Sequence, residues 1–382
     1  MKKLLYIAFN DIENQLFGVK AKILSQCRVF GESGFQVDLL QRKEAETVLL
    51  RDGAVVETVK PRTARIGNRY VRSVLDKSHQ LKDIKTFLKG KTYAGCYIRF
   101  DFTDPGFIGL LKRLRKVCPK IILELPTYPY DDENKAMLLS RVKLAVDKIY
   151  RKKLHKYVDL IVTFYGGQEK IFGIPVLTVP NGFDFSTMSM VTRELTGDPI
   201  HIIAVSSMRE WHGYERFLEG MSRYYSGGGK REFVLHLVGN GREFGKYQAL
   251  AQSLGNRVVM EGAMSGAPLD ALYERCALGI DSLGRHRSGI HVLSSLKSRE
   301  YGAKGIPMIN SCKIDIIEGD FPYLLQVPAD ETPIDMDAVA AFYDRCFAGK
   351  DRLTVAAEIR AYIESKSGMT QTLAAVVREF HK

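Results

Sequence analysis

Residues 295–309 of this 382-residue chain read Ser-Leu-Lys-Ser-Arg-Glu-Tyr-Gly-Ala-Lys-Gly-Ile-Pro-Met-Ile. The spacing predicts an amphipathic helix over 295–303 that stops at Gly305. Pro307 lies just beyond the stop and opens a buried strand over 307–310. A helix that leads within a few residues into a buried strand is typical of an α/β domain.

The start of this helix is suited to an anion. The hydroxyls of Ser294 and Ser295 can cap exposed N–H groups, and the backbone through Leu296 presents N–H groups and the helix dipole to a phosphate. Lys297 and Glu300 lie three residues apart on one face. A carboxylate at Glu300 can accept hydrogen bonds from two neighbouring ribose hydroxyls. The alternative reading is a surface Lys–Glu pair on an ordinary helix.

Strands and helices alternate on both sides of this segment. In the first half, the predicted strands are 4–9, 35–40, 93–100, 120–125 and 160–164, and the predicted helices are 21–31, 107–117 and 135–157. In the second half, the predicted strands are 200–206, 232–238, 258–261 and 278–280, and the predicted helices are 215–224, 245–254, 268–276, 334–347, 354–362 and 370–380. This alternation predicts an α/β fold with two Rossmann-like parallel-sheet domains facing a cleft, in which ligands bind at the carboxyl ends of strands.

The composition excludes several classes of protein. With 45% hydrophobic and 26% charged residues, the chain is neither disordered nor fibrous. It has no apolar run of membrane-spanning length, and its six cysteines are scattered without a C-x-x-C pair, so we expect a reduced, cytoplasmic protein. The histidines and cysteines have no metal-ligand spacing, so no metal is expected.

The net charge of +12 lies entirely in the first half. Residues 1–185 contain 33 Lys and Arg against 20 Asp and Glu, whereas residues 186–382 contain 23 against 24. A basic half attracts nucleic acid, an anionic membrane or an anionic substrate, and the alternative is a solvated surface that favours solubility. Nucleic-acid-binding motifs are absent, so no nucleic-acid partner is expected.

Two further motifs follow predicted strands of the second half. After strand 200–206 come Arg209, the only Trp and His212-Gly213. After the next strand comes Gly239-Asn240-Gly241, whose glycines permit close backbone approach. An arginine guanidinium can pair with a diphosphate through two hydrogen bonds. Taken singly, the first motif is better explained by a surface arginine, and a plain turn explains the second equally well.

In this order, the motifs resemble the C-terminal domain of GT-B glycosyltransferases, and more narrowly the family 4 group of retaining nucleotide-sugar enzymes. Residues 238–241 resemble the V-G-x-G turn of that family, 300–309 its E-Y-x-A-x-G-x-P-(V/I)-I motif, and 178–184 its V-I-P-N-G-V-D segment at the domain junction. The resemblance implies an acceptor-binding domain at 1–185 and a nucleotide-sugar-binding domain at 186–360. It also implies a C-terminal helix, 361–382, that packs back on the first domain.

The resemblance also implies the chemistry. It points to a metal-independent hexosyltransferase that needs no cofactor, takes a UDP- or GDP-linked sugar as donor and retains the anomeric configuration. Glu300 would bind the ribose. The groups assigned to the donor diphosphate are Arg209, Lys297, His212 and the backbone of Ser294, Ser295 and Leu296, and Gly18 would let the loop 14–18 approach it. The turn of Gly239, Asn240 and Gly241 is assigned to substrate binding, and Arg209, Lys297 and Glu300 are the catalytic residues.

The sequence departs from the family pattern at three places. Val292 replaces the first of two glutamates, so only Glu300 is carried over. His212 replaces a lysine, and its positive charge would be weaker and pH-dependent around an unperturbed pKa of about 6.5. The strand that ends in a histidine in the family reads 121–129 here and has none. Glu124 is its ionisable candidate for catalysis, with a structural carboxylate as the equal alternative.

The basic first half suggests where the acceptor lies. The helix 135–157 has an apolar stripe and a basic face, as helices in the membrane plane do, although the stripe can equally pack on a sheet as core. We therefore expect transfer to a glycan or lipid-linked saccharide in cell-surface polysaccharide synthesis, with the protein peripheral on the inner membrane face. The alternatives are a GT-B-fold sugar-nucleotide epimerase, which needs no acceptor, and a non-catalytic GT-B-like binding subunit.

Overall fold

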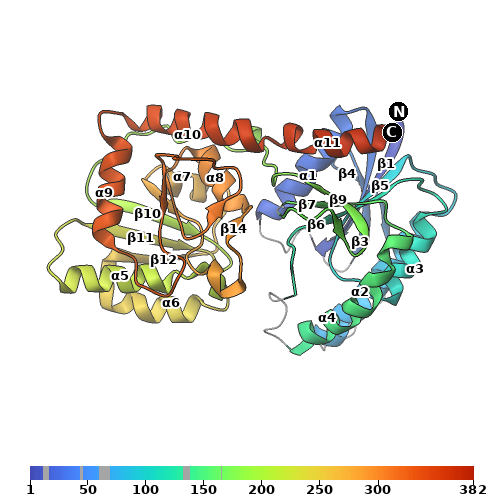
Figure 1. Ribbon diagram of the computed structural model, residues 1–382, viewed down its shortest axis with the longest axis horizontal. Helices are drawn as coiled ribbons and strands as arrows, with labels where there is room; N and C mark the ends of the chain where they lie inside the picture. Colours follow the sequence, from blue (N-terminus) through green and yellow to red (C-terminus); the bar gives the residue numbers. More distant parts are fainter. Residues whose placement is uncertain (12–16, 44–45, 60–68, 132–137, 165) are drawn as a thin grey trace. The chain divides into compact units, whose positions relative to one another are not determined.

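The structure is a computed structural model that describes residues 1–11, 17–43, 46–59, 69–131, 138–164 and 166–382 (Figure 1). The chain forms two compact units, Met1–Gly182 together with Met369–Lys382, and Phe183–Gly368. A boundary at residue 360 would cut helix α10 (Arg352–Ser367), whose Ile359 and Ile363 are buried in the core of the second unit. The chain therefore returns to the first unit only at Met369.

In its described residues, the first unit contains a nine-stranded sheet of order β4-β3-β2-β1-β5-β6-β7-β9-β8. The strands are β1 (Lys2–Asp11), β2 (Phe35–Lys43), β3 (Glu46–Arg51), β4 (Ala54–Val59), β5 (Gly95–Arg99), β6 (Ile121–Leu125), β7 (Leu160–Thr163), β8 (Lys170–Ile171) and β9 (Ile174–Thr178). The central strands are parallel, as predicted, but β3, β4 and β8 add antiparallel edges. The β3–β4 hairpin turns at Asp52-Gly53, both at positive φ, which is the backbone that a tight hairpin requires.

Helices cover both faces of this sheet. They are α1 (Phe17–Glu32) and α11 (Met369–His381) on one face, and α2 (Arg69–Phe87), α3 (Pro105–Leu114) and α4 (Leu138–Tyr150) on the other (Figure 1). Strand β1 sends Leu4 and Tyr6 into the core beneath α1 and α11, and Leu5 and Ile7 into the opposite core. Because both faces are covered, β1 reads as a continuous apolar run. The predicted helix 135–157 is α4 followed by the 3-10 helix η2 (Arg151–Lys156), and its first three residues lie outside the described ones.

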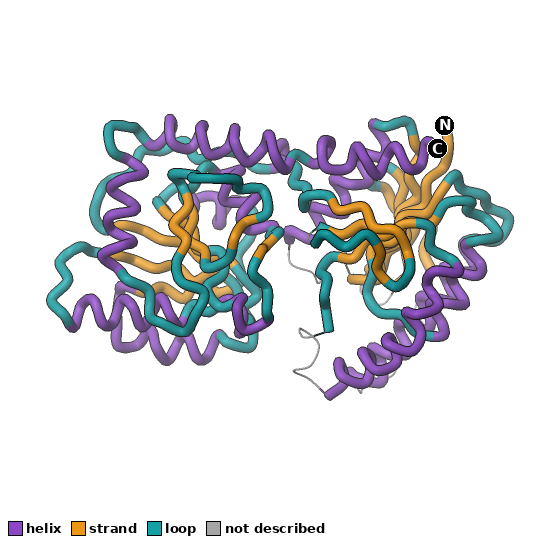
Figure 2. The backbone as a smooth tube through the Cα atoms, viewed as in Figure 1, coloured by secondary structure: helices purple, strands orange, loops and turns teal. Residues whose placement is uncertain are grey.

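The second unit contains a parallel sheet with helices around it (strands orange and helices purple in Figure 2). This sheet has six strands in the order β12-β11-β10-β13-β15-β17. Its strands are β10 (Ile200–Val205), β11 (Phe233–Val238), β12 (Val258–Gly262), β13 (Leu278–Ile280), β15 (Met308–Asn310) and β17 (Leu324–Gln326), and β14 (Val292–Leu293) pairs separately with β16 (Lys313–Ile314). The α-helices are α5 (Glu215–Ser226), α6 (Phe244–Ala251), α7 (Ala267–Tyr273), α8 (Leu296–Lys304), α9 (Met336–Phe347) and α10. Short 3-10 helices include η3 (Phe185–Thr187), η4 (Glu210–His212), η5 (Gln252–Arg257) and η6 (Arg285–Ser288).

Two further properties concern the whole described chain. Within the described residues, no helix is long and apolar enough to cross a bilayer. The six cysteines are free thiols, and all but Cys27 are buried.

Candidate active site

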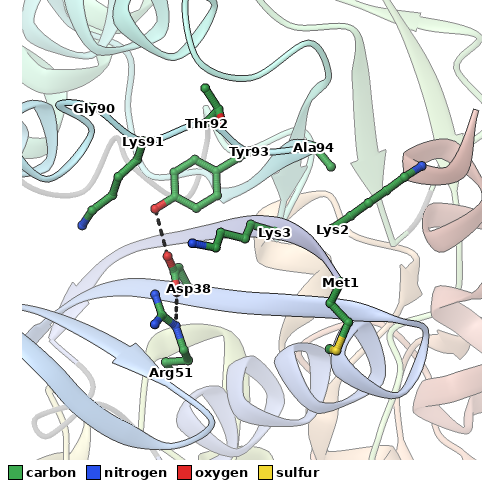
Figure 3. A pocket seen from close by; sticks show the side chains of 10 residues that line it. All are labelled: Met1, Lys2, Lys3, Asp38, Arg51, Gly90, Lys91, Thr92, Tyr93 and Ala94. Carbon is green, nitrogen blue, oxygen red and sulfur yellow. Dashed lines mark hydrogen bonds and ion pairs between the residues drawn. The ribbon is translucent and has the colours of Figure 1, made fainter.

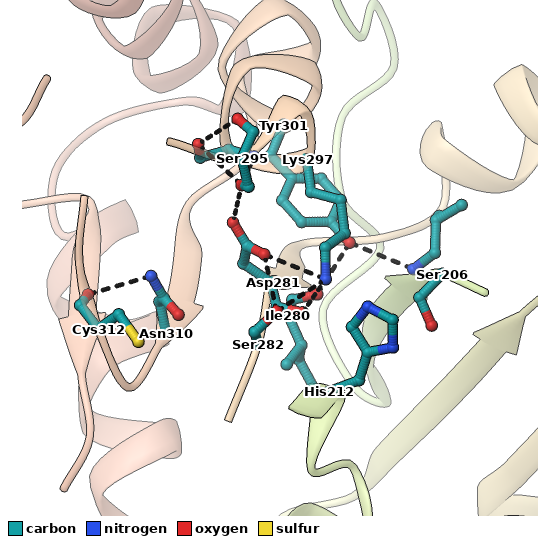
Figure 4. A network of polar contacts seen from close by, with 12 residues as sticks. Ser206, His212, Ile280, Asp281, Ser282, Ser295, Lys297, Tyr301, Asn310 and Cys312 are labelled. Carbon is teal, nitrogen blue, oxygen red and sulfur yellow. Dashed lines mark hydrogen bonds and ion pairs between the residues drawn. The ribbon is translucent and has the colours of Figure 1, made fainter. Parts of the chain in front are cut away.

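The candidate site lies where the strand order of the second sheet reverses. From β10 the chain proceeds outward through β11 and β12 on one side, and through β13, β15 and β17 on the other. The boundary between β10 and β13 is therefore a topological switch point. In open α/β sheets, ligands bind at such a point, in the crevice outside the carboxyl ends of the strands. The loop 206–213 follows β10, the loop 281–289 follows β13, and α8 begins beside them (Figure 4).

The glycines of the 239–241 turn allow two loops to touch. A Cβ on Gly239 would lie 1.9 Å from the carbonyl oxygen of Ser206, and one on Gly241 would lie 1.9 Å from that of Ser207. The turn thus presses against the loop after β10 and fixes its path, while Asn240 is exposed between the two glycines. This explains the G-x-G pattern by packing, without requiring a ligand.

Helix α8 starts with a side-chain cap. Ser295 is the N-cap; its hydroxyl accepts a hydrogen bond from the Ser298 N–H at 3.1 Å and donates one to the carboxylate of Asp281. The N–H groups of Leu296 and Lys297 belong to the first turn and have no partner within the helix. These two N–H groups and the dipole make this end attractive to a phosphate.

Lys297 is held against strand β13. Its Nζ lies 3.0 Å from Oδ1 of Asp281, donates to the Asp281 carbonyl oxygen and lies 3.1 Å from the hydroxyl oxygen of Ser282 (Figure 4). The side chain is partly buried. The cation that the sequence assigned to the diphosphate is therefore present at the crevice, but paired with a buried carboxylate.

His212 is neutral near pH 7, contrary to the expected pH-dependent charge. Burial, together with the positive charges of Lys297, Arg285 and Arg209, holds the pKa of His212 well below its usual value. Its Nδ1 accepts a hydrogen bond from the Arg209 N–H at 2.9 Å, so the ring proton is on Nε2. His212 can donate a hydrogen bond to an anion, but it supplies no charge.

Arg209 is the exposed cation of the same loop. It directly precedes η4, and no ion pair to it is found among the described residues. The only tryptophan, Trp211, lies two residues on and packs against the guanidinium of Arg285, 5.4 Å from its ring centroid. The loops after β10 and β13 thus each bring an arginine, Arg209 and Arg285, to the switch point.

Glu300 lies about one helical turn beyond Lys297 on α8. The hydroxyl of Tyr273 donates to its Oε1 at 3.1 Å, and within the described chain no hydrogen bond is found to its Oε2. Burial raises the pKa of Glu300 above its usual value, although Tyr273, Lys304 and Lys297 act against the rise. One carboxylate oxygen is held in place and the other can accept hydrogen bonds.

The sequence matches no protein-family model and no curated protein. Solved structures match it over its whole length. HepE of Anabaena, in complex with UDP and glucose, has a TM-score of 0.61 at 12% identity and covers 100% of both chains. A glycosyltransferase from Rickettsia africae has a TM-score of 0.60 at 11% identity, covering 100% of this chain and 99% of its own. The lipopolysaccharide outer core galactosyltransferase WaaB, in its apo form, has a TM-score of 0.57 at 16% identity and covers 99% of both.

The chain has the GT-B fold. The two Rossmann-like domains expected from the sequence are thereby confirmed. The groups described so far all belong to the second domain of this GT-B chain, residues 183–368.

Two of the expected site residues lie in the first domain. Gly18 is the second residue of α1, and most of the loop expected before it, 14–16, lies outside the described residues. Glu124 lies on the central strand β6 and has no exposed surface. One of its carboxylate oxygens accepts from Gln26 and Tyr97, each at 2.7 Å, and the other pairs with Arg99 and, at 3.6 Å, with Lys22.

Glu124 is therefore a structural carboxylate in this GT-B chain. Burial alone would raise its pKa, but Lys22 and Arg99, with the two hydrogen bonds, outweigh burial and lower the pKa below its usual value. A carboxylate that is ionised, enclosed and fully paired cannot reach a substrate. This favours the second of the two readings that the sequence left open for Glu124.

A separate cavity of about 580 Å3 lies in the first domain (Figure 3). It is lined by Met1, Lys2, Lys3, Asp38, Arg51, Gly90, Lys91, Thr92, Tyr93 and Ala94, at the amino ends of β1 and β5. Its carboxylate, Asp38, accepts from Arg51 at 2.7 Å and from Tyr93 at 3.0 Å. The cavity lies at the amino ends of the strands, where α/β sheets do not usually bind substrates.

Proposed function

We propose that this protein is a retaining, metal-independent glycosyltransferase that moves a hexose from a UDP- or GDP-linked donor to a glycan or lipid-linked saccharide. The observation that carries the proposal is that helix α8, which bears Lys297 and Glu300, begins at the switch point with a capped N-terminus, and that the exposed Arg209 lies in the loop after β10. HepE, which is similar in fold, binds UDP and glucose, and WaaB is a galactosyltransferase.

Each group has a role in holding the donor. Glu300 would accept hydrogen bonds from the ribose hydroxyls, each contributing roughly 1.5–3 kcal/mol to a charged acceptor. The N–H groups of Leu296 and Lys297, the Nε2–H of His212 and the charges of Arg209 and Lys297 would face the diphosphate. These donors and charges would stabilise the negative charge that develops on the departing diphosphate, which is electrostatic catalysis without a metal or cofactor.

The first prediction concerns donor binding. UDP or GDP should raise the melting temperature of the full chain, because a ligand that binds only the folded state adds about 2.7 kcal/mol of stability at one hundred times its Kd. Differential scanning fluorimetry with UDP, GDP, UMP and ATP is the measurement, with Glu300→Ala as the matched control. Stabilisation by neither UDP nor GDP would remove the proposal.

Product analysis then separates the remaining functions. Incubation with the donor alone yields an epimeric nucleotide sugar if the protein is an epimerase. Donor binding without transfer or hydrolysis, over a panel of saccharide acceptors, identifies a non-catalytic binding subunit. Transfer of the sugar with the same anomeric configuration supports a retaining glycosyltransferase.

We also propose that the first domain works at an anionic membrane surface, where lipid-linked acceptors of cell-surface polysaccharide synthesis reside. Leu144 of α4 and Leu154 of η2 are buried, which leaves the opposite face of both helices outward. Val142 and Ile149 on that face are 55% and 62% exposed. The exposed basic residues around them are Arg141, Lys148, Lys152, Lys153 and Lys156. Apolar residues ringed by lysines are the pattern of a helix that lies in a bilayer interface.

The second prediction tests this face. Replacing Lys152 and Lys153 together by glutamate should lower binding to vesicles of phosphatidylglycerol by about tenfold or more, since each lysine near an anionic surface contributes about 1 kcal/mol. The control reverses two exposed lysines of the second domain, Lys230 and Lys313. Co-sedimentation at low salt is the measurement. Equal binding of the unmodified protein to anionic and neutral vesicles contradicts the proposal.

A further inference from the structure

Asp281 is a fully enclosed ionisable group of the candidate site. It directly follows β13 and has no exposed surface. Its Oδ1 lies 3.0 Å from Nζ of Lys297, and its Oδ2 accepts from the N-cap hydroxyl of Ser295. Its carbonyl oxygen accepts from Lys297 and, at 3.1 Å, from the hydroxyl of Tyr214. One residue, directly after β13, thus holds both the cation and the cap of α8 (Figure 4).

The ammonium of Lys297 is saturated by these contacts. An ammonium has three N–H donors. Lys297 has four acceptors around it: the carboxylate and carbonyl of Asp281, the hydroxyl of Ser282 and, at 3.5 Å, the hydroxyl of Tyr214. A diphosphate can therefore receive a hydrogen bond from Lys297 only by displacing one of them. Until then, the carboxylate cancels much of the positive potential that Lys297 would otherwise present.

We infer that Asp281 is a positioning residue that also limits the affinity of the site for nucleoside diphosphates. It holds Lys297 and the first turn of α8 in place, and it competes with the diphosphate for the lysine charge. The inference rests on the proposed function, because it concerns the same diphosphate. Its consequence is that the nucleoside diphosphate product leaves more readily than it would from an uncompensated lysine.

The test is the affinity for UDP, or for GDP if that is the nucleotide that binds, measured by isothermal titration calorimetry on the full chain. Asp281→Asn keeps the shape of the side chain and removes its charge, so nucleotide binding should tighten by about threefold or more. Lys297→Met should weaken it. In the Lys297→Met background, Asp281→Asn should change the affinity by less than about twofold, since the effect acts through the lysine.

A purely structural role of Asp281 predicts the opposite change in nucleotide affinity. If Asp281 only supports the fold, Asp281→Asn lowers the melting temperature and weakens nucleotide binding, and that result would overturn the inference. Asp281→Ser is a second neutral variant with the same expected tightening, should the asparagine variant fail to fold. Asp344→Asn is the control, because it makes the same charge change at an exposed residue of α9 in the same domain.

The two proposals fail in different ways. If the unmodified protein binds neither UDP nor GDP, the proposed function falls. If the unmodified protein binds one of them and Asp281→Asn binds it equally well or less tightly, only the inference about Asp281 falls.

Discussion

Glu300→Ala and Arg209→Ala are each expected to lower kcat/KM at least about tenfold, which corresponds to about 1.4 kcal/mol of transition-state stabilisation. Glu300→Ala removes the carboxylate that would accept hydrogen bonds from the ribose hydroxyls, and it leaves the Tyr273 hydroxyl without this acceptor. Arg209→Ala removes an exposed positive charge, for which no ion pair is found among the described residues. Initial rates with the donor that stabilises the protein in the binding screen give the measurement.

The controls make similar changes away from the crevice. Glu318 is 77% exposed, and Arg223 is exposed near the end of α5. Their alanine variants should retain kcat/KM within about twofold. Wild-type-like turnover in both Glu300→Ala and Arg209→Ala would remove the assignment of roles.

The raised pKa of Glu300 adds a pH signature. Binding of ribose hydroxyls needs the ionised carboxylate, which is present only above the pKa. Because burial raises that pKa, kcat/KM should begin to fall on the acid side at a higher pH than an ordinary glutamate would cause. This part of the decline should be absent from the pH profile of Glu300→Ala.

Glu124→Gln is expected to destabilise the first domain by about 3–5 kcal/mol, because it leaves two buried cations without their carboxylate. Lys22 and Arg99 are 3% and 10% exposed, so water cannot replace the lost charge. The stability of the first domain should be measured by the hydrogen-exchange protection of the backbone amides of β5 and β6. The only tryptophan, Trp211, lies in the second domain, so its fluorescence reports that domain and should show an unchanged transition.

Glu57→Gln is the matched control for Glu124. Glu57 also pairs with a lysine, Lys91, at 3.4 Å, but it is 51% exposed. An exposed pair contributes about 0–1 kcal/mol, so this variant should exchange almost as the unmodified protein does. Equal protection of β5 and β6 in the Glu124 and Glu57 variants would show that the buried network does not stabilise the fold.

The effect of Glu124 also depends on pH. Its pKa in the folded protein is lowered relative to the unfolded chain, so its stabilisation is fully present above the unfolded pKa of about 4.3 and is lost as the pH falls through the lower folded pKa. Glu124→Gln cannot bind this proton, so its stability should change less with pH across that acid range.

Local patterns were sufficient to predict most of the fold. The run 4–9 reads as a strand covered on both faces, and β1 has Leu4 and Leu5 in opposite cores. The motif at 295–309 predicts α8 and β15 almost to the residue, because capping, the glycine stop and the apolar strand are local chemistry. The β3–β4 hairpin was not predicted, although an Asp-Gly pair between two apolar runs, here Asp52-Gly53, is a sequence signal for a hairpin. Helix α2 was not predicted, because polar and charged residues outnumber apolar ones in its sequence and weaken the apolar periodicity.

The amino-acid sequence alone determined which segments form strands and helices, where α8 begins, and that Glu300 and Lys297 share one face of it. Only the tertiary structure decided which ionisable side chains can act. Glu124 is enclosed by Lys22 and Arg99 from other elements, His212 is neutral because it is buried near cations, and Asp281 meets Lys297 across 16 positions of the chain. The physical reason is that charge and protonation depend on burial and on neighbours distant in sequence, whereas strands, caps and turns depend on residues only a few positions apart.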